Sequence, residues 1–464
     1  MEGEPELDNM RDEIAQTTIE IVRLIAKRNG LARRVGAVKK NVSLPVEDES
    51  VEAGLVGRVI RECDTVGLER SVGLKVLHTL IAEGKRVQGV TGEQVADSPM
   101  LALEKAVGLE RQGKKLIRLD VGEPDFRPPK AVLQACSEAL FSFKTHYTLP
   151  RGIPELRSAL RSYLKRKNSF DAKDGELLVT PGGRFAVFSA LASVLREGES
   201  AIVIDPNWPA FRQALLFIGA RPIVISTELE DDWDLSIEDV KKAVRPDTKA
   251  MVVSYPCNPS GKVVDPAFFR ELLGVANDNG LTVVSDEIYN EYSYKACPTV
   301  LAGGAERFVL TASFSKTWAM TGFRIGYAVS SEDVVSRMAN VVSLMVTSVP
   351  EFIQYGAIEA LSSERESQEN RTLMKERIDV AGKELARIDS LRYSEPDGGM
   401  YYFPMLAKAG MNAAEFGTRL LNEKGVSVTP GTAFGDYPRH FRISLGQPKE
   451  LLVDGIRRMG ELLE

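Results

Sequence analysis

One lysine of this chain stands where it could bond covalently to an aldehyde. Lys316 follows a short β-branched segment and lies among small hydroxyl residues, in Ser313-Phe-Ser315-Lys316. Most lysines are solvated surface cations. An amine desolvated at the end of a buried strand, by contrast, has a lowered pKa and can form a Schiff base. The segment therefore favours a lysine that holds an aldehyde cofactor.

Other residues match what pyridoxal 5′-phosphate would need. Its phosphate needs N–H groups and cations, its ring nitrogen a carboxylate, its phenolic oxygen hydrogen-bond donors, and its ring an aromatic cover. In that order, the candidates are Gly182-Gly183-Arg184 with Ser313 and Arg324, then Asp286, then Asn258 with Tyr289, then Trp208. The alternative for Trp208 is an ordinary core position. We predict pyridoxal 5′-phosphate as the cofactor and no metal.

The elements that must position these residues are short apolar strands. β-Branched runs occur at 177–180, 201–204, 222–225, 250–254, 281–285 and 308–312. Most are separated by stretches long enough for a helix, which is typical of an α/β fold with a mostly parallel sheet. Ligands of such folds collect at the carboxyl ends of the strands, where the candidate residues lie.

Composition excludes several other classes of protein. The chain has 464 residues, of which 44% are hydrophobic and 27% charged, and a formal net charge of −6. This charge offers no field for collecting nucleic acid or anionic lipid, and no apolar run approaches the roughly 18 residues that cross a bilayer. Four cysteines lie far apart, without metal spacing. We expect a reduced, cytoplasmic protein with no nucleic-acid or membrane partner.

Six segments in a fixed order carry a family resemblance. They are Val121-Gly-Glu-Pro-Asp-Phe126, Tyr147-Thr-Leu-Pro-Arg-Gly-Ile-Pro-Glu-Leu156, Asn258-Pro-Ser-Gly261, Ser285-Asp-Glu-Ile-Tyr289, Ser313-Phe-Ser-Lys316 followed by Arg324, and Arg442-Ile-Ser. With them, residues from about 98 to 464 resemble a class I, fold-type I aminotransferase of the aspartate/aromatic group. The resemblance implies an aminotransferase domain at 100–464, with a cofactor domain at about 143–380 and a small domain at about 100–142 plus 381–464.

The resemblance also implies a role for each matching residue. Lys316 would be the Schiff-base lysine and the base of the proton shift, and Asp286 would face the pyridine nitrogen. Arg442 would clamp the substrate α-carboxylate, helped by the backbone of Gly122. The remaining cofactor contacts would come from Asn258, Tyr289, Gly183, Arg184, Ser313, Arg324 and, from the other subunit, Tyr147.

Substrate choice is less readable from the sequence. A dicarboxylate needs a second cation, and Arg127 or Arg184 could supply it or could simply be solvated. The aromatic stretch 400–403 could line a pocket, but a buried strand is the favoured interpretation.

The N-terminal 90 residues show helical periodicity without a convincing strand. Apolar spacing predicts helices over the first 40 residues, about 48–64 and about 68–88, followed by a linker at 91–99. Arg28 and Lys39 are eleven residues apart and so share one helix face. Two cations facing a helical interior need anions. Salt bridges to Glu13 or Glu20 are favoured on spacing alone, and a dianionic ligand is the alternative.

Residues 1–90 resemble the all-helical chorismate mutase class, which reverses that preference. The matching positions are Arg11, Arg28, Leu31, Val35-Gly36, Lys39, Pro45-Val, Asp48, Glu52 and Gln88. The resemblance implies that Lys39 and Gln88 bond the ether oxygen of chorismate, that Arg28 and a partner's Arg11 bind its carboxylates, and that Glu52 takes its hydroxyl. Asp48 belongs to the same implied substrate site.

Two positions depart from the pattern of that class. Val51 replaces its usual arginine, and Gly84 a frequent hydroxyl residue.

The two resemblances together predict a bifunctional enzyme of phenylalanine and tyrosine synthesis. It would convert chorismate to prephenate and transaminate an aromatic 2-oxo acid, or prephenate itself, as a homodimer. The alternatives are a prephenate or aspartate aminotransferase whose helical domain only binds an effector, and a DNA-binding regulator. The nearly balanced charge of residues 1–90 and their long first helix argue against DNA.

Overall fold

The computed structural model describes residues 4–41, 49–87, 108, 110–111, 113–302, 304–408 and 410–464. The chain divides into two compact units, Met1–Ala96 and Asp97–Glu464. Within the described ranges, no helix combines the length and apolar content needed to cross a bilayer.

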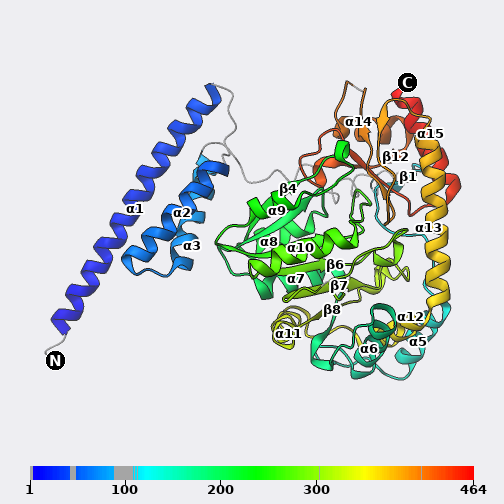
Figure 1. Cartoon of the computed structure of the whole chain (residues 1–464), viewed down its shortest axis with the longest axis horizontal. Coiled ribbons are helices and arrows are strands. Elements are labelled where there is room, and N and C mark those ends of the chain that lie inside the picture. The colour runs from blue at the N-terminus through cyan, green and yellow to red at the C-terminus, as the bar shows by residue number, and fades with distance from the viewer. Residues whose placement is uncertain are drawn as a thin grey trace. The chain divides into compact units, whose positions relative to one another are not determined.

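The first unit consists of α1 (Glu4–Asn41), α2 (Glu49–Val66) and α3 (Arg70–Val87). All three predicted helices are confirmed. The end of the first helix and both ends of the second and third lie within two residues of the predicted positions. The long α1 runs beside the shorter pair (Figure 1). Val56, Leu74 and Leu77 form a small core between α2 and α3. The apolar residues of α1 stay largely exposed, for example Ile14 at 67% and Leu24 at 63%.

The second unit is built on a seven-stranded sheet of order β2-β8-β7-β6-β5-β3-β4. Its strands are β2 (Leu177–Thr180), β3 (Ser200–Asp205), β4 (Arg221–Ser226), β5 (Thr248–Ser254), β6 (Thr282–Asp286), β7 (Phe308–Ser313) and β8 (Gly326–Ser330). The six predicted strands are confirmed, and only β8, which the sequence analysis missed, runs antiparallel to its neighbours. The α/β prediction with a mostly parallel sheet is therefore confirmed.

Helices cover both faces of this sheet (Figure 1). They are α5 (Lys130–Phe141), α6 (Pro154–Asn168), α7 (Gly183–Val194), α8 (Ala210–Phe217), α9 (Ile237–Ala243), α10 (Pro266–Asp278), α11 (Glu332–Val346) and α12 (Glu351–Ser362). Alternate residues of the central strands enter opposite cores. Met251 and Val253 pack with α6, α9, α10 and α12, whereas Val252 packs with α7, α8 and α11. Burial on both faces explains why these strands read as continuous apolar runs.

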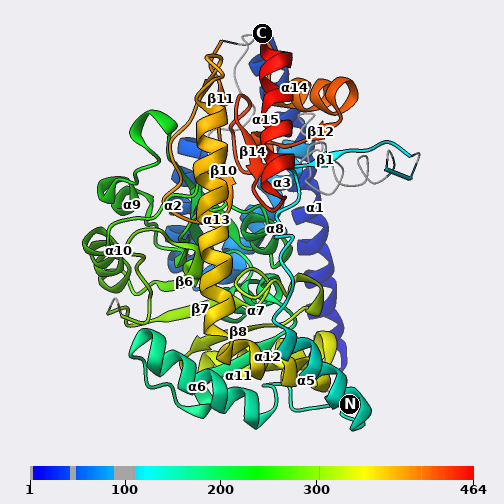
Figure 2. The same cartoon turned by 90° about the vertical axis from the view of Figure 1, so that its right-hand side faces the viewer.

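A second group of small sheets joins the two ends of this unit. β1 (Ile117–Arg118) pairs with β12 (Val426–Ser427), and β14 (Phe441–Ser444) lies between β10 (Tyr401–Tyr402) and β13 (Thr429–Pro430). β9 (Leu391–Arg392) pairs with β11 (Met405–Leu406). These strands pack with α13 (Glu364–Leu385), α14 (Ala413–Arg419) and α15 (Lys449–Leu463) around their own core. Figure 2 shows the long α13 running from the region of α12 to α15.

Candidate active site

A cavity of about 350 Å³ lies where the parallel strands end. Turns after β2, β3, β5, β6 and β7 reach it, together with the segments at 120–122 and 442. Eleven residues predicted from the sequence line this cavity: Gly122, Gly183, Arg184, Trp208, Asn258, Asp286, Tyr289, Ser313, Lys316, Arg324 and Arg442. The predicted Tyr147 is not among them, and its side chain is 87% exposed on this chain.

Lys316 lies three residues past β7, with its amine directed to the loop after β1. Its Nζ donates a hydrogen bond to the carbonyl oxygen of Gly122. The pKa of Lys316 is lowered to about 8, mainly by burial and partly by the nearby charges of Arg442 and Arg324, while Glu123 opposes the change. A large fraction of this amine is therefore neutral near pH 8, as a nucleophile or base must be.

Asp286 ends β6 and is one of two buried acids that line the cavity. Burial raises its pKa to about 7, although a hydrogen bond of 3.1 Å from Thr311 Oγ1 favours the charged form. The charge of the neighbouring Glu287 contributes to the same rise in pKa. Among the described residues no cation is paired with this carboxylate, and a protonated pyridine nitrogen would supply one.

The turn between β2 and α7 forms a cradle for an anion. A side chain at Gly183 would bring a Cβ to 2.4 Å from Ile288 Cδ1, and one at Gly182, whose φ is +87°, to 2.7 Å from Arg324 Nη2. The backbone can therefore approach a ligand only because both residues are glycines. The first N–H groups of α7 belong to this turn and can bind an anion. Arg184 and Arg324 add two positive charges; the pKa of Arg184 is lowered mainly by burial and further by the charge of Arg324. A phosphate suits this arrangement.

Arg184 also stacks on Trp208, with its guanidinium carbon 4.8 Å from the ring centroid. Taken together, the amine, the buried acid, the glycine cradle and its two cations fit pyridoxal 5′-phosphate.

The opposite wall carries a pair of tyrosines and an arginine. Tyr289 and Tyr401 join their hydroxyl oxygens at 2.6 Å. Burial raises the pKa of Tyr289 well above its ordinary value, so the phenol stays protonated and can donate. Asn258 accepts a hydrogen bond of 3.0 Å from Arg442 Nη1.

Arg442 has donors to spare. Its Nη2 donates to the carbonyl oxygen of Asp120 at 2.6 Å, and its Nε is buried without a partner in the described part of the chain. Because a guanidinium carries five N–H donors and only two are used, three remain for a ligand. The rings of Tyr401 and Phe434 lie 4.5 and 4.9 Å from its guanidinium carbon, within the range of cation–π contacts. Arg442 is therefore placed to bind a carboxylate.

Several lining residues were missed by the sequence analysis, namely Asp120, Gln213, Thr321 and Phe434. The stretch 400–403 does contain a buried strand, as favoured, but Tyr401 also lines the cavity. The aromatic run was the only signal that pointed to it. Arg127 is exposed and lies outside the lining.

In the helical unit, Arg28 is half-buried and reaches across to α3. Its Nη1 donates to the carbonyl oxygen of Leu80. The salt bridges to Glu13 or Glu20, which spacing alone favoured and the resemblance argued against, are not found for Arg28 among the described residues, because its side chain turns toward α3 instead. Gly84 lies beside it, and a Cβ there would be 3.1 Å from Arg28 Nη1.

The other predicted residues of this unit are more scattered. Arg11 is exposed and pairs with Asp8 at 3.1 Å, and Lys39 is half-buried near the end of α1. Glu52 lies on α2, but its side chain is outside the described part of the chain, as are Asp48 and Gln88. The structure therefore shows Arg28 and Gly84 together and leaves the rest of this predicted site as a prediction.

Comparisons with known proteins agree with both units. The model of "Aminotransferase class I and II" matches residues 114–458, and that of "Chorismate mutase type II" matches residues 10–89. A probable aspartate/prephenate aminotransferase of Aquifex aeolicus is 34% identical, covering 79% of this chain and 96% of its own. Aromatic-amino-acid aminotransferase 2 of Thermococcus litoralis is 32% identical, covering 78% and 95%.

A solved structure of aspartate aminotransferase from Thermus thermophilus with maleate has a TM-score of 0.76 at 32% identity, and covers 82% of this chain and 99% of its own. The chain therefore belongs to the class I and II aminotransferases, a family that uses pyridoxal 5′-phosphate, and carries a type II chorismate mutase domain ahead of its transaminase domain.

Proposed function

We propose that this enzyme converts chorismate to prephenate and then transfers an amino group to prephenate or to an aromatic 2-oxo acid derived from it. The observation that carries the proposal is the fusion itself. A chorismate mutase domain and an aminotransferase domain share one chain, and relatives of the second are named for prephenate or aromatic amino acids. The product of the first step is thus a substrate, or the precursor of a substrate, for the second.

At the transaminase site we assign the chemistry to five groups. Bound pyridoxal 5′-phosphate supplies a ring that withdraws electrons from the α-carbon of the amino acid. Lys316 accepts and returns the proton at its Nζ, and Asp286 keeps the ring nitrogen protonated. Asn258 and Tyr289 hold the phenolic oxygen, and Trp208 covers one ring face.

The phosphate is held by Gly183, Arg184, Ser313 and Arg324, which line one end of the cavity. Arg442 clamps the α-carboxylate, and the backbone of Gly122 helps to position it. Lys316, Arg184, Arg324 and Arg442 are the only cations among the described residues that line the cavity. If all four act in this way, this chain leaves no cation over for a distal carboxylate, which favours acceptors with an uncharged side chain or a contribution from a second subunit.

In the helical unit we assign Lys39 and Gln88 to the ether oxygen of chorismate, Arg28 and a partner's Arg11 to its carboxylates, and Glu52 and Asp48 to the remaining substrate contacts. The rearrangement needs no covalent catalyst, so cations and hydrogen-bond donors suffice. The retained Arg28 supports activity despite Val51 and Gly84.

We further propose that the enzyme is a cytoplasmic homodimer in which both sites are shared. Support comes from apolar side chains that one chain leaves exposed in each unit. Ile14 and Leu24 on α1 are examples in the first, and Phe143 and Tyr147 are examples in the second. Tyr147 would reach the partner's phosphate site and Arg11 the partner's mutase site.

The test supplies chorismate with glutamate or aspartate and identifies the products by mass spectrometry. We expect arogenate if prephenate is the acceptor. If an aromatic 2-oxo acid is the acceptor, prephenate should accumulate, and phenylalanine or tyrosine should form only when phenylpyruvate or 4-hydroxyphenylpyruvate is added, because neither domain decarboxylates prephenate. Lys316→Ala should stop amino transfer completely and leave chorismate consumption unchanged, because the amine acts in only one of the two reactions. Lys249→Ala, at an exposed position, is the control and should change neither.

Two outcomes would contradict the proposal. Chorismate that is not consumed would support a helical unit that only binds an effector. Aspartate–oxaloacetate exchange that is much faster than any aromatic reaction would indicate a plain aspartate aminotransferase.

A further inference from the structure

The loop after β1 contacts both basic side chains that act on the amino acid. The carbonyl oxygen of Gly122 accepts from Lys316 Nζ, and that of Asp120 accepts from Arg442 Nη2 at 2.6 Å. Only one residue separates the two carbonyls. Any movement of this loop therefore changes the acceptors of both groups.

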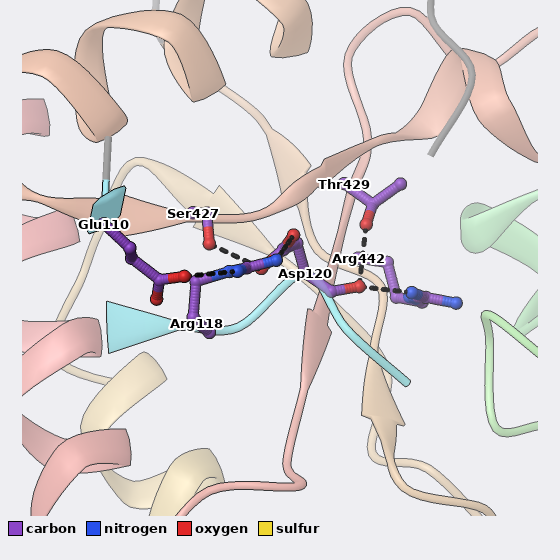
Figure 3. A network of polar contacts seen from close by, with 6 residues as sticks. All are labelled: Glu110, Arg118, Asp120, Ser427, Thr429 and Arg442. Carbon is purple, nitrogen blue, oxygen red and sulfur yellow. Dashed lines mark hydrogen bonds and ion pairs between the residues drawn. The ribbon is translucent and has the colours of Figure 1, made fainter. Parts of the chain in front are cut away.

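The Asp120 carboxylate anchors this loop from the side away from those contacts (Figure 3). Arg118 binds it through a two-pronged fork, with Nε and Nη2 each 2.9 Å from one carboxylate oxygen. Ser427 Oγ donates a third hydrogen bond at 2.5 Å. Glu110 accepts from Arg118 Nη1 at 3.3 Å and so fixes the far side of the guanidinium.

The carbonyl group of Asp120 is held as firmly as its carboxylate. Thr429 Oγ1 donates to this oxygen at 3.2 Å, beside the bond from Arg442 (Figure 3). Thr429 also stands directly opposite Arg442 in the pairing of β13 with β14, and Ser427 stands opposite Arg118 in that of β12 with β1. One short set of strands thus positions the arginine and its acceptor together.

The charge on Asp120 is retained although the side chain is only 5% exposed. Burial alone would raise its pKa, but the hydrogen bonds from Arg118 and Ser427 outweigh burial and leave the pKa below its ordinary value. A buried ion pair of this kind adds little net stability and serves mainly to fix geometry. What it fixes here is the carbonyl that faces Arg442.

We propose that Asp120 is a positioning residue that sets the orientation of the Arg442 guanidinium through its own backbone carbonyl, with Arg118 and Ser427 as its supports. The proposal rests on the proposed role of Arg442 as the α-carboxylate clamp. With one donor given to Asn258 and one to Asp120, the guanidinium is held at two points, and its unused donors point in one fixed direction. Asp120 does not itself need to touch the substrate.

The test is steady-state kinetics of Asp120→Asn in the holoenzyme. Asparagine keeps the size of the side chain but loses the charge and half of the Arg118 fork. We expect KM to rise about tenfold for the amino acid and for the 2-oxo acid alike, because both present the same carboxylate, while kcat falls less than about threefold. A primary amine without a carboxylate should react with unchanged kcat/KM, and the absorbance of the bound cofactor should stay the same.

Asp247→Asn is the matched control. Asp247 is also buried and paired with an arginine, Arg221, at 2.7 Å, but neither residue lines the cavity. Its loss should leave every KM unchanged. Should Asp120→Asn fail to fold, Ser427→Ala removes a single support and should raise both KM values about two- to fivefold.

Equal losses with the carboxylate-free amine, or unchanged KM values, would overturn the proposal. Arg442→Lys separates this failure from failure of the clamp itself. If Arg442→Lys raises both KM values and Asp120→Asn does not, only the positioning role is wrong. If Arg442→Lys changes neither KM, the clamp is wrong as well.

Discussion

Asp286 and Lys316 respond to the same desolvation in opposite directions. Burial raises the pKa of the acid to about 7 and lowers that of the amine to about 8. In both cases the neutral form gains. Without the cofactor, burial therefore disfavours the charged forms of both side chains. A ligand with a cationic nitrogen and an anionic phosphate offsets this cost in free energy.

We predict that Asp286→Asn stabilises the cofactor-free protein in a pH-dependent way. A carboxyl whose pKa is raised on folding contributes most at low pH, and the contribution is lost as the pH rises from its unfolded value of 3.8 to about 7. Asparagine has no proton to lose. The variant should thus gain about 2–3 kcal/mol over the wild type between pH 5 and pH 8.

Urea unfolding of the cofactor-free proteins at several pH values measures this gain. If the free energies of unfolding of the two proteins depend on pH in the same way, the wild-type carboxylate carries no such cost. Amino transfer by the variant should be strongly reduced, because an amide cannot keep the ring nitrogen charged.

Among the site residues, those that directly follow a strand were easier to predict from the sequence than those that reach the site from distant parts of the chain. Asp286, Asn258 and Lys316 each follow an apolar run, so their place at a strand end could be read locally. Phe434 and Asp120 have no such signal. Phe434 contacts Arg442 through the folding of a distant loop, and Asp120 acts through a carbonyl group, which every residue possesses.

Among the elements, β8 shows where the pattern of alternating strands and helices fails. The segment between β7 and β8 holds Lys316 and Arg324 and has no long helix, so the chain returns antiparallel. Gly326 is needed at this return, because a Cβ there would lie 2.6 Å from the carbonyl oxygen of Ala312. The sequence analysis predicted no strand here, and the active-site loop stands where a crossover helix would lead to a parallel strand.

Glycines of α2 and α3 give a prediction for the helical unit. Gly84→Ala places a methyl group 3.1 Å from Arg28 Nη1 and should displace this side chain. We expect chorismate consumption to fall at least about threefold. Gly54→Ala is the control, because a Cβ at that position meets nothing within 4 Å.

Both substitutions favour the helix by up to about 1 kcal/mol. A difference in activity between them therefore reports on Arg28 and not on folding. The absorbance of chorismate measures the reaction, and amino transfer in the same samples serves as an internal reference. Equal activity of the two variants would show that Arg28 tolerates the crowding.

On the scale of the whole molecule, each unit exposes an apolar surface of its own. We predict that the wild type sediments as a dimer and that Leu24→Glu lowers chorismate mutase activity at least about tenfold while amino transfer stays within about twofold. Leu24 is 63% exposed on α1, so the charge costs the single chain little and acts on an interface.

Gln16→Glu, at an exposed polar position of the same helix, should leave both activities unchanged. A wild-type monomer with full activity in analytical ultracentrifugation would contradict the shared sites.

For the molecule as a whole, a change in the pattern of apolar residues along the sequence reveals the two units. Helical periodicity ends before the proposed linker at 91–99, and β-branched runs begin after it. The pairing of β1 with β12 could not be read in the same way, because each strand has two residues and the partners carry no matching pattern. Only the closed fold brings them together.

Asp120 and Ser427, which share a hydrogen bond, are 307 residues apart in the sequence, and Arg442 follows Ser427. During synthesis the ribosome must therefore deliver nearly the whole polypeptide before the amino-transfer site can close. The three helices of the first unit end at residue 87 and can pack together much sooner. A nascent chain can therefore form its chorismate mutase fold first. Translation that stops before residue 426 leaves β1, near the start of the transaminase unit, without its partner strand β12.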